Sequence, residues 1–309
     1  MADSMVVHWG DLSIMLPTEP NTPPNSRVWR FIHFPLVLLF IGFVFVFGGQ
    51  IVASMFAKLS PPLKGTPVSV LQAAAFAALI AGAYVAFVRL IERRPVVEFD
   101  PAGWARELGA GLGAGLLLFS AVIGVIALFG GYRVVGTGTV ASLYPAAAMA
   151  ILSGVVEEIV LRGLFFRLLE RLLGSWIALA LSAALFGALH LGNPGATVSA
   201  AVAIALEAGV MLAALYMLTR RLWAAIGLHA AWNFAQGGIY GIAVSGFKQT
   251  GLLVPSVQGP EWLTGGRFGA EASLPAVLVD TAFGVALLVL AYRRGRFVAP
   301  MWVRRRLTA

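Results

Sequence analysis

The sequence predicts an all-α, polytopic transmembrane bundle of about eight helices. Hydrophobic residues make up 59% of the chain and charged residues only 12%, whereas soluble domains carry about 25% charged residues. The mean hydropathy is +0.87. Apolar runs of roughly 20 residues, long enough to cross a bilayer, recur along the chain. This composition favours a membrane protein over a soluble globular enzyme.

Eight apolar runs define the expected helices. The fifth and sixth are separated only by "LGNPGAT", in which Asn193-Pro194-Gly195 is typical of a tight turn. A re-entrant element at this point is the alternative. The eight runs are 34–56, 69–91, 108–130, 139–165, 175–191, 196–218, 222–244 and 273–292.

The pattern divides the chain into three regions. Residues 1–33 include the proline-rich "PTEPNTPPNS" and are expected to form a polar, disordered cytoplasmic tail. The transmembrane domain is expected over 34–292, and a basic cytoplasmic tail over 293–309. The first apolar run begins too far into the chain for a cleavable signal peptide, so we expect it to be retained.

The net charge of +8 is explained by membrane orientation. Most of the 22 lysines and arginines lie in the two tails and in the connections after the second, fourth and sixth runs. Basic residues concentrate on the cytoplasmic side. We therefore expect a protein of the bacterial inner (cytoplasmic) membrane with both termini cytoplasmic, and no nucleic-acid partner. The absence of cysteine excludes disulfides, a thiolate nucleophile and a cysteine metal site.

Glycines in the third run predict close helix packing. The stretch "GAGLGAG", Gly109 to Gly115, contains GxxxG spacing, which lets two helix backbones approach each other. It does not fit the GxGxxG pattern of dinucleotide-binding loops.

The stretch "EEIVLRG" places three charged residues inside an apolar run. An ionisable side chain at mid-bilayer costs about 2.5–3.5 kcal/mol, so it marks a functional site by default. Glu158 and Arg162 are four residues apart with the acid first, which favours an ion pair. Glu157 lies about 100° round the helix and has no basic partner at that spacing. We expect it to face a polar cavity inside the membrane and to accept a proton, with a structural role as the alternative. For the Glu158–Arg162 pair we expect a structural role that holds helices together.

The two histidines inside apolar runs each have a helix-spaced partner. His229 and Asn233 in "HAAWN" share one helix face, as do Phe186 and His190 in "FGALH". The structural alternatives are an interhelical hydrogen-bonding pair at 229 and 233 and an interfacial residue at 190.

Three further residues in the apolar runs have less distinctive surroundings. Glu207 is expected to line a cavity or to pair with another residue. Asp280 is assigned no role, and Trp232 is expected to pack or to anchor the chain at an interface.

Three motifs, in order and on separate apolar runs, resemble those of the CAAX-protease and bacteriocin-processing (CPBP, or Abi) family of intramembrane proteases. "EEIVLRG" resembles the EExxxR motif, "FGALH" the FxxxH motif and "HAAWN" the HxxxN motif. The resemblance covers about residues 139–245 and includes the type II CAAX prenyl endopeptidases. It implies an intramembrane endopeptidase that hydrolyses a peptide bond with glutamate-activated water.

The resemblance also implies a role for each motif residue. Glu157 would be the general base, His190 would help to hold the water, and His229 and Asn233 would donate hydrogen bonds to the developing oxyanion. The residues that would support this site are Glu158, Arg162 and Phe186.

The resemblance implies no metal cofactor, and zinc is the alternative. Glu157, His190 and His229 are an acceptable ligand set for zinc with an open water position. However, the HExxH signature is absent, and Asn233 would be a poor zinc ligand.

The family does not determine the substrate. The expected partners are the lipid bilayer and a membrane-embedded or lipidated peptide or protein, but Glu207 would repel a substrate carboxylate and so argues against CaaX specificity. A non-catalytic immunity or scaffold protein that binds a peptide is the alternative function. A transporter would show inverted repeats and paired broken helices, and the sequence shows neither.

Overall fold

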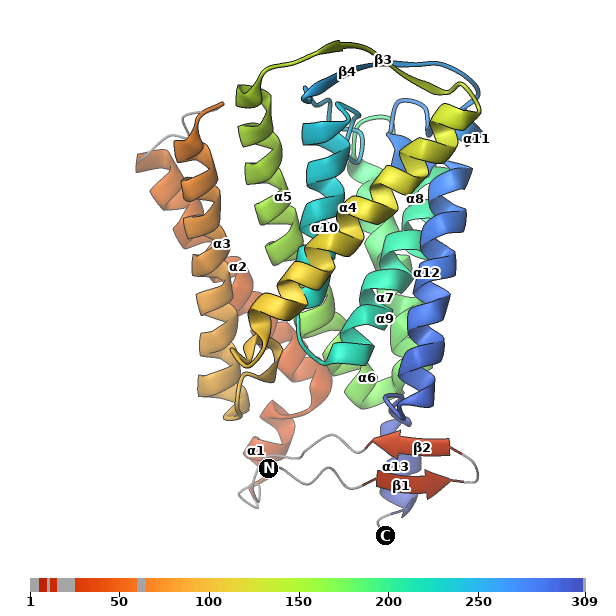
Figure 1. The fold of residues 1–309 in the computed structure, drawn as a ribbon. Coiled ribbons are helices and arrows are strands. Elements are labelled where there is room, and N and C mark those ends of the chain that lie inside the picture. Colours follow the sequence, from red (N-terminus) through yellow and green to blue (C-terminus); the bar gives the residue numbers. More distant parts are fainter. Residues whose placement is uncertain (1–5, 10–11, 16–25, 60–64, 308–309) are drawn as a thin grey trace.

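The computed structural model describes residues 6–9, 12–15, 26–59 and 65–307. It confirms the predicted all-α membrane bundle (Figure 1), with six helical segments long and apolar enough to cross a membrane in this part of the chain. They are α2 (Pro35–Leu59), α3 (Pro67–Phe87) with its π-helical continuation Val88–Glu92, α4 (Trp104–Leu128), α7 (Ser175–Leu189), α8 (Val198–Ile204) continuing through a π-helical turn into α9 (Val210–Thr219), and α12 (Leu274–Arg293).

The fourth and seventh predicted runs are also helical, but each changes its helix type. The fourth run contains α5 (Leu143–Glu158), which passes into the π-helical segment Ile159–Phe166 and then into α6 (Arg167–Leu173). The seventh contains α10 (Trp223–Phe234), followed by the π-helical turn Ala235–Ile239. These two runs carry the EExxxR and HxxxN motifs, whose polar side chains interrupt the apolar surface.

Helix α10 lies inside the bundle, where it packs against α4, α5 and α9. Glycines of α4 allow this close approach. A Cβ at Gly111 would lie 2.2 Å from the carbonyl oxygen of Ala224, and a Cβ at Gly115 would lie 2.3 Å from that of Leu228. The GxxxG spacing therefore does mark a close helix contact, as predicted.

A short antiparallel ribbon crosses one end of the bundle. It consists of β3 (Tyr132–Thr137) and β4 (Leu253–Val257), and it lies over α5 and α10 (Figure 1). The short helix α11 (Glu261–Thr264) lies at the same end. The ribbon is not expected from the sequence, because its two strands are far apart in the chain.

Part of each predicted tail has regular structure. In the N-terminal segment, β1 (Val6–Trp9) pairs with β2 (Leu12–Met15), and α1 (Arg27–Ile32) precedes the first long helix. These elements differ from the disordered tail predicted over 1–33, whose other residues up to 25 lie outside the described ranges. The C-terminal segment contains α13 (Met301–Leu307). Helices α1 and α13 lie at the end of the bundle opposite β3 and β4 (Figure 1).

Ion pairs between buried acids and arginines join elements at the end that holds α1 and α13. Glu92 forms ion pairs with Arg94 and Arg167 at 3.0 and 2.8 Å, and Glu98 forms ion pairs with the same two arginines at 2.8 and 3.3 Å. Glu170 pairs with a third arginine, Arg220. We call these residues the paired-acid cluster: Glu92, Glu98 and Glu170 with Arg94, Arg167 and Arg220.

Candidate active site

Glu158 and Arg162 form a fully buried ion pair with an Nη1–Oε1 distance of 2.8 Å, as their spacing predicts. Arg162 also donates through Nη2 to the carbonyl oxygens of Ala208 and Gly209, at 3.1 and 3.3 Å. Its guanidinium lies 4.8 Å from the ring centroid of Phe186, in a cation–π contact. The pair therefore ties the π-helical segment after α5 to α7 and to the turn between α8 and α9.

Glu158 also fixes the orientation of His229. Its Oε1 accepts from Nδ1 of His229 at 2.9 Å as well as from Arg162. Because an ionised carboxylate only accepts hydrogen bonds, Nδ1 carries the hydrogen, and Nε2 is free to face the other way. This Nε2 lies 3.9 Å from Oε2 of Glu157. Helix spacing cannot predict the His229–Glu158 contact, since the two residues are 71 positions apart.

Glu157 is the free acid of the motif. Its side chain is 37% exposed, whereas that of Glu158 is fully buried. Among the described residues no arginine or lysine pairs with it. Glu157 faces a cavity of about 1370 Å³ that is lined mainly by apolar residues of α2, α3 and α5. Ser69, Gln72 and Gln249 are polar members of that lining.

His190 is oriented by the end of its own helix. Its Nδ1 lies 2.7 Å from the carbonyl oxygen of Phe186, so Nδ1 donates and Nε2 of the neutral ring is left as an acceptor. The Phe186 ring contacts both histidines, with centroid distances of 4.9 Å to His190 and 6.1 Å to His229. Phe186 therefore packs against both imidazoles.

Asn233 contacts α5 across the helix interface. Its Nδ2 donates to the hydroxyl of Ser153 at 2.8 Å. The two helices approach closely at Gly154, where a Cβ would lie 2.9 Å from the Cβ of Ala230. Sequence reasoning did not recognise Ser153, although it stands one turn before Glu157, and that spacing could have identified it.

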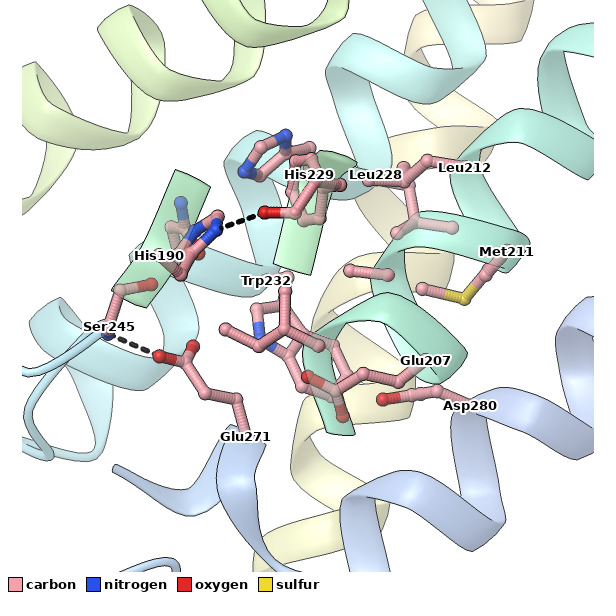
Figure 2. A pocket seen from close by; sticks show the side chains of 14 residues that line it. His190, Glu207, Met211, Leu212, Leu228, His229, Trp232, Ser245, Glu271 and Asp280 are labelled. Atoms are coloured by element: carbon pink, nitrogen blue, oxygen red, sulfur yellow. Dashed lines mark hydrogen bonds between the residues drawn. The ribbon is translucent and has the colours of Figure 1, made fainter. Parts of the chain in front are cut away.

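The predicted catalytic residues lie on two neighbouring cavities. His190, His229 and Asn233 line a small cavity of about 30 Å³ (Figure 2). Glu157 lines the large one, and its carboxylate approaches the imidazole of His229 to 3.9 Å. The linings of the small and large cavities thus approach each other at the Glu157–His229 contact.

Three acids also line the small cavity, and we call them the pocket acids: Glu207, Glu271 and Asp280 (Figure 2). Glu207 lies in the wall of a cavity, one of its two expected positions. Asp280 has a place here that the sequence did not indicate. Glu271 was missed because it lies in a connection, in the 3₁₀ turn Ala270–Ala272 before α12. Trp232 lines the same cavity.

Departures from regular α-helix accompany all three motifs. The π-helical segment begins directly after Glu158, and the turn that follows Asn233 is also π-helical. His190 begins the 3₁₀ turn at the end of α7, and Glu207 lies in the π-helical turn Ala205–Gly209. The π-helical turns among these are rare and often occur at functional sites, because they rotate side chains away from their α-helical directions.

The predicted alternative of a zinc site does not fit this geometry. Among the described residues, no three histidine, aspartate or glutamate side chains lie close enough together to hold a metal ion. Glu157, His190 and His229 therefore do not form a zinc ligand set here. Glu157 instead faces the large cavity, whereas His190 and His229 line the small one.

Comparison with known families identifies the segment that carries this site. Residues 139–235 match the model of the type II CAAX prenyl endopeptidase Rce1-like family. The match covers most of the segment over which the motifs resemble the CPBP family, so it agrees with the predicted resemblance. The Rce1-like match supports a CAAX-type intramembrane protease in general, and the six apolar helices make the chain an integral membrane protein. No curated protein and no solved structure matches the chain.

The Rce1-like segment holds the predicted site residues but only part of the small cavity. Glu157, His190, His229 and Asn233 all lie within 139–235, as does Glu207. Glu271 and Asp280 lie beyond the segment, although they line the same cavity. The motif core is therefore completed by side chains that come from the C-terminal part of the bundle.

Proposed function

We propose that this protein is an intramembrane endopeptidase that hydrolyses a peptide bond of a membrane-embedded or lipidated substrate with water activated by Glu157. The different contacts of the two adjacent acids, Glu157 and Glu158, support the proposal. Glu158 is committed to Arg162 and His229, whereas Glu157 has no basic partner among the described residues and faces a large apolar cavity. A carboxylate in that position can accept a proton from water.

The proposed reaction has no covalent intermediate. Glu157 takes a proton from water as the water oxygen bonds to the scissile carbonyl carbon, and the carbonyl oxygen becomes an oxyanion. His190 holds the water by accepting its second hydrogen at Nε2. The C–N bond then breaks as Glu157 returns its proton to the leaving amine, which gives a carboxylic acid and an amine.

His229 and Asn233 would stabilise the oxyanion. Nδ1–H of His229 donates to Glu158, which turns Nε2 toward the reacting centre. Nε2 donates to the oxyanion when the ring is doubly protonated, as a cation between the carboxylates of Glu158 and Glu157. Asn233 is held by Ser153 through one hydrogen of its amide, so the second hydrogen remains for the oxyanion. Donors fixed in this way need no reorganisation as charge develops, and this is the source of their catalytic effect.

The large cavity would admit the substrate from the membrane. It lies between α2, α3 and α5, and its lining includes the exposed apolar residues Phe56 and Leu79. Its volume of about 1370 Å³ is above the range of about 300–1,000 Å³ usual for small-ligand pockets. It is therefore large enough for a peptide segment or a lipid chain to reach Glu157.

We further propose that no metal takes part and that both termini are cytoplasmic in the bacterial inner membrane. The metal proposal is supported by the poor fit of Glu157, His190 and His229 to a zinc site. The orientation is supported by the arginines at the end of the bundle that holds α1 and α13, since basic residues concentrate on the cytoplasmic side.

Mapping of protein termini tests the proposed function. Membranes from cells that make the full chain are compared with membranes from cells that make Glu157→Gln at the same level, and new C-termini are identified by mass spectrometry. We expect a set of termini that depends on Glu157. Identical termini in the two samples, with both proteins folded, would overturn the enzyme and leave the peptide-binding alternative.

A further inference from the structure

The pocket acids differ from the other buried acids of the bundle. Glu92, Glu98, Glu158 and Glu170 each form an ion pair with at least one arginine. In the described ranges 26–59 and 65–307, no ion pair involves any of the pocket acids. All three are at least 97% buried, with exposures of 2% for Glu207, 3% for Glu271 and 1% for Asp280.

Two of the pocket acids also have carboxylate oxygens without a protein partner. Oε2 of Glu207 and both oxygens of Asp280 are buried and accept no hydrogen bond from the described residues. Figure 2 shows these two carboxylates turned toward each other, and both line the small cavity. Glu271 differs, because its Oε1 accepts the backbone N–H of Ser245. Buried acceptors left unpaired are costly, so the arrangement calls for a donor that enters the cavity.

The shape and walls of the cavity limit what that donor can be. A volume of about 30 Å³ holds about two water-sized atoms, since one water needs roughly 10–15 Å³ by this measure. No three acid or histidine side chains of the described chain converge as metal ligands. Trp232 and Phe186 supply aromatic walls, and aromatic faces attract ammonium groups. A primary ammonium is compact and donates three hydrogen bonds. It also carries the positive charge that no ion-pair partner supplies to the pocket acids.

We propose that the pocket acids bind the ammonium group of a substrate lysine whose side chain enters beside the scissile bond. The same cavity is lined by His190, His229 and Asn233, so an ammonium bound there lies next to the proposed reacting centre. Glu207 and Asp280 would accept its hydrogen bonds, and Glu271 would add to the negative charge. This inference rests on the proposed function and narrows its substrate class to peptides with a lysine near the cleavage site.

Binding of a small amine tests the pocket without any need for cleavage. The probe is methylammonium chloride, whose two heavy atoms fit the cavity, added to the purified full chain in detergent, with methanol and sodium chloride at equal concentration as controls. At several times the dissociation constant, we expect the ammonium salt to raise the thermal unfolding midpoint by about 2 °C. Glu157→Gln should show the same rise, because Glu157 lies outside this cavity.

Variants of the pocket acids decide whether the rise comes from this site. Glu207→Gln and Asp280→Asn are made separately, so that one can replace the other if it fails to fold. Each should abolish the response, while Glu261→Gln, which neutralises an exposed acid of α11, should preserve it. An equal rise with sodium chloride, no rise in the natural chain, or a full response in both pocket variants would overturn the inference.

The sequences around the cleavage sites give a second, independent test of the inference. Among the termini that depend on Glu157, we expect a lysine at one fixed position within a few residues of the cut. Glu207→Gln should reduce kcat/KM for such a peptide by at least about tenfold more than for the same peptide with methionine in place of lysine, because only the lysine peptide loses a charged hydrogen bond. Glu157-dependent cuts without a fixed lysine would overturn the inference but not the protease. If no such cuts occur, the protease fails while the amine response still tests the pocket.

Discussion

The paired-acid cluster and the pocket acids show two ways of burying carboxylates in one bundle. In the cluster, Glu92 and Glu98 share Arg94 and Arg167 at 2.8–3.3 Å, so each charge has a partner. In the pocket, Glu207 and Asp280 are just as buried, but they have no ion pair among the described residues. The ion pairs of the cluster connect elements of the bundle. The unpaired carboxylates of the pocket are the groups that we propose bind a substrate ammonium.

The largest effect on stability should come from breaking the cluster. Arg167→Met leaves the acids Glu92 and Glu98 with Arg94 alone, and removing one partner of a buried pair costs about 3–5 kcal/mol. The free energy of unfolding, measured by denaturation in mixed micelles, should fall by that order. Glu207→Gln is the matched change in the pocket. It should leave the free energy of unfolding unchanged or raise it, because it removes a buried acid that has no basic partner. Equal losses of stability in the two variants would show that the paired-acid cluster and the pocket acids do not differ in this way.

Asn233→Ala should lower turnover strongly without a comparable loss of stability. Loss of one oxyanion donor typically reduces kcat by about 10²–10³-fold, and the Asn233 amide donates only to Ser153 within the described structure. Kinetics on a substrate found by terminus mapping would measure the loss. Ser153→Ala is a useful comparison, since it removes the positioning contact and should reduce kcat less. A variant at 233 with full turnover would show that the oxyanion has other donors.

The pH dependence of stability should distinguish Glu271 from the paired acids. Burial raises the pKa of Glu271 to about 7, against the opposing effect of the hydrogen bonds from Ser245. Since this pKa is higher in the folded than in the unfolded chain, the folded state holds the extra proton between about pH 4.5 and 7. Stability is therefore greatest below this window and falls by about 3 kcal/mol as the pH rises through it.

Unfolding measured between pH 4 and 8 checks this expectation. The natural chain should lose stability on the alkaline side, and Glu271→Gln should flatten that part of the curve. If the variant and the natural chain have the same pH profile, Glu271 does not carry an extra proton in the folded protein.

The smallest expected effect is that of a chelator. Because Glu157, His190 and His229 do not converge as metal ligands, we expect cleavage to continue in excess EDTA and the purified protein to contain no stoichiometric zinc by elemental analysis. Loss of activity in chelator, with recovery on addition of zinc, would contradict the metal-free proposal.

Sequence patterns predicted the helices and the family resemblance of residues 139–235 well, because both depend on short-range patterns in the sequence. Apolar runs located the long helices, and GxxxG spacing located the contact of Gly111 and Gly115 with α10. Spacing within "EEIVLRG" also separated Glu158, which pairs with Arg162, from Glu157, which does not.

Contacts between distant segments could not be predicted in this way. The hydrogen bond from His229 to Glu158 joins α10 to α5, and helix periodicity gives no information about such a contact. Asp280 and Glu271 reach the small cavity from α12 and the turn before it, so no single run shows them beside Glu207. The π-helical segments add to the difficulty, because they change side-chain directions without a clear sequence signal.

Paired substitution of the two motif acids tests the central claim most directly. Glu157→Gln and Glu158→Gln are compared in the purified full chain for cleavage of a mapped substrate and for thermal unfolding. Glu157→Gln should retain the natural unfolding midpoint and lose all measurable cleavage, while Glu158→Gln should lower the midpoint because the buried Arg162 loses the carboxylate that neutralises its charge. Full cleavage by a folded Glu157→Gln protein would contradict the account.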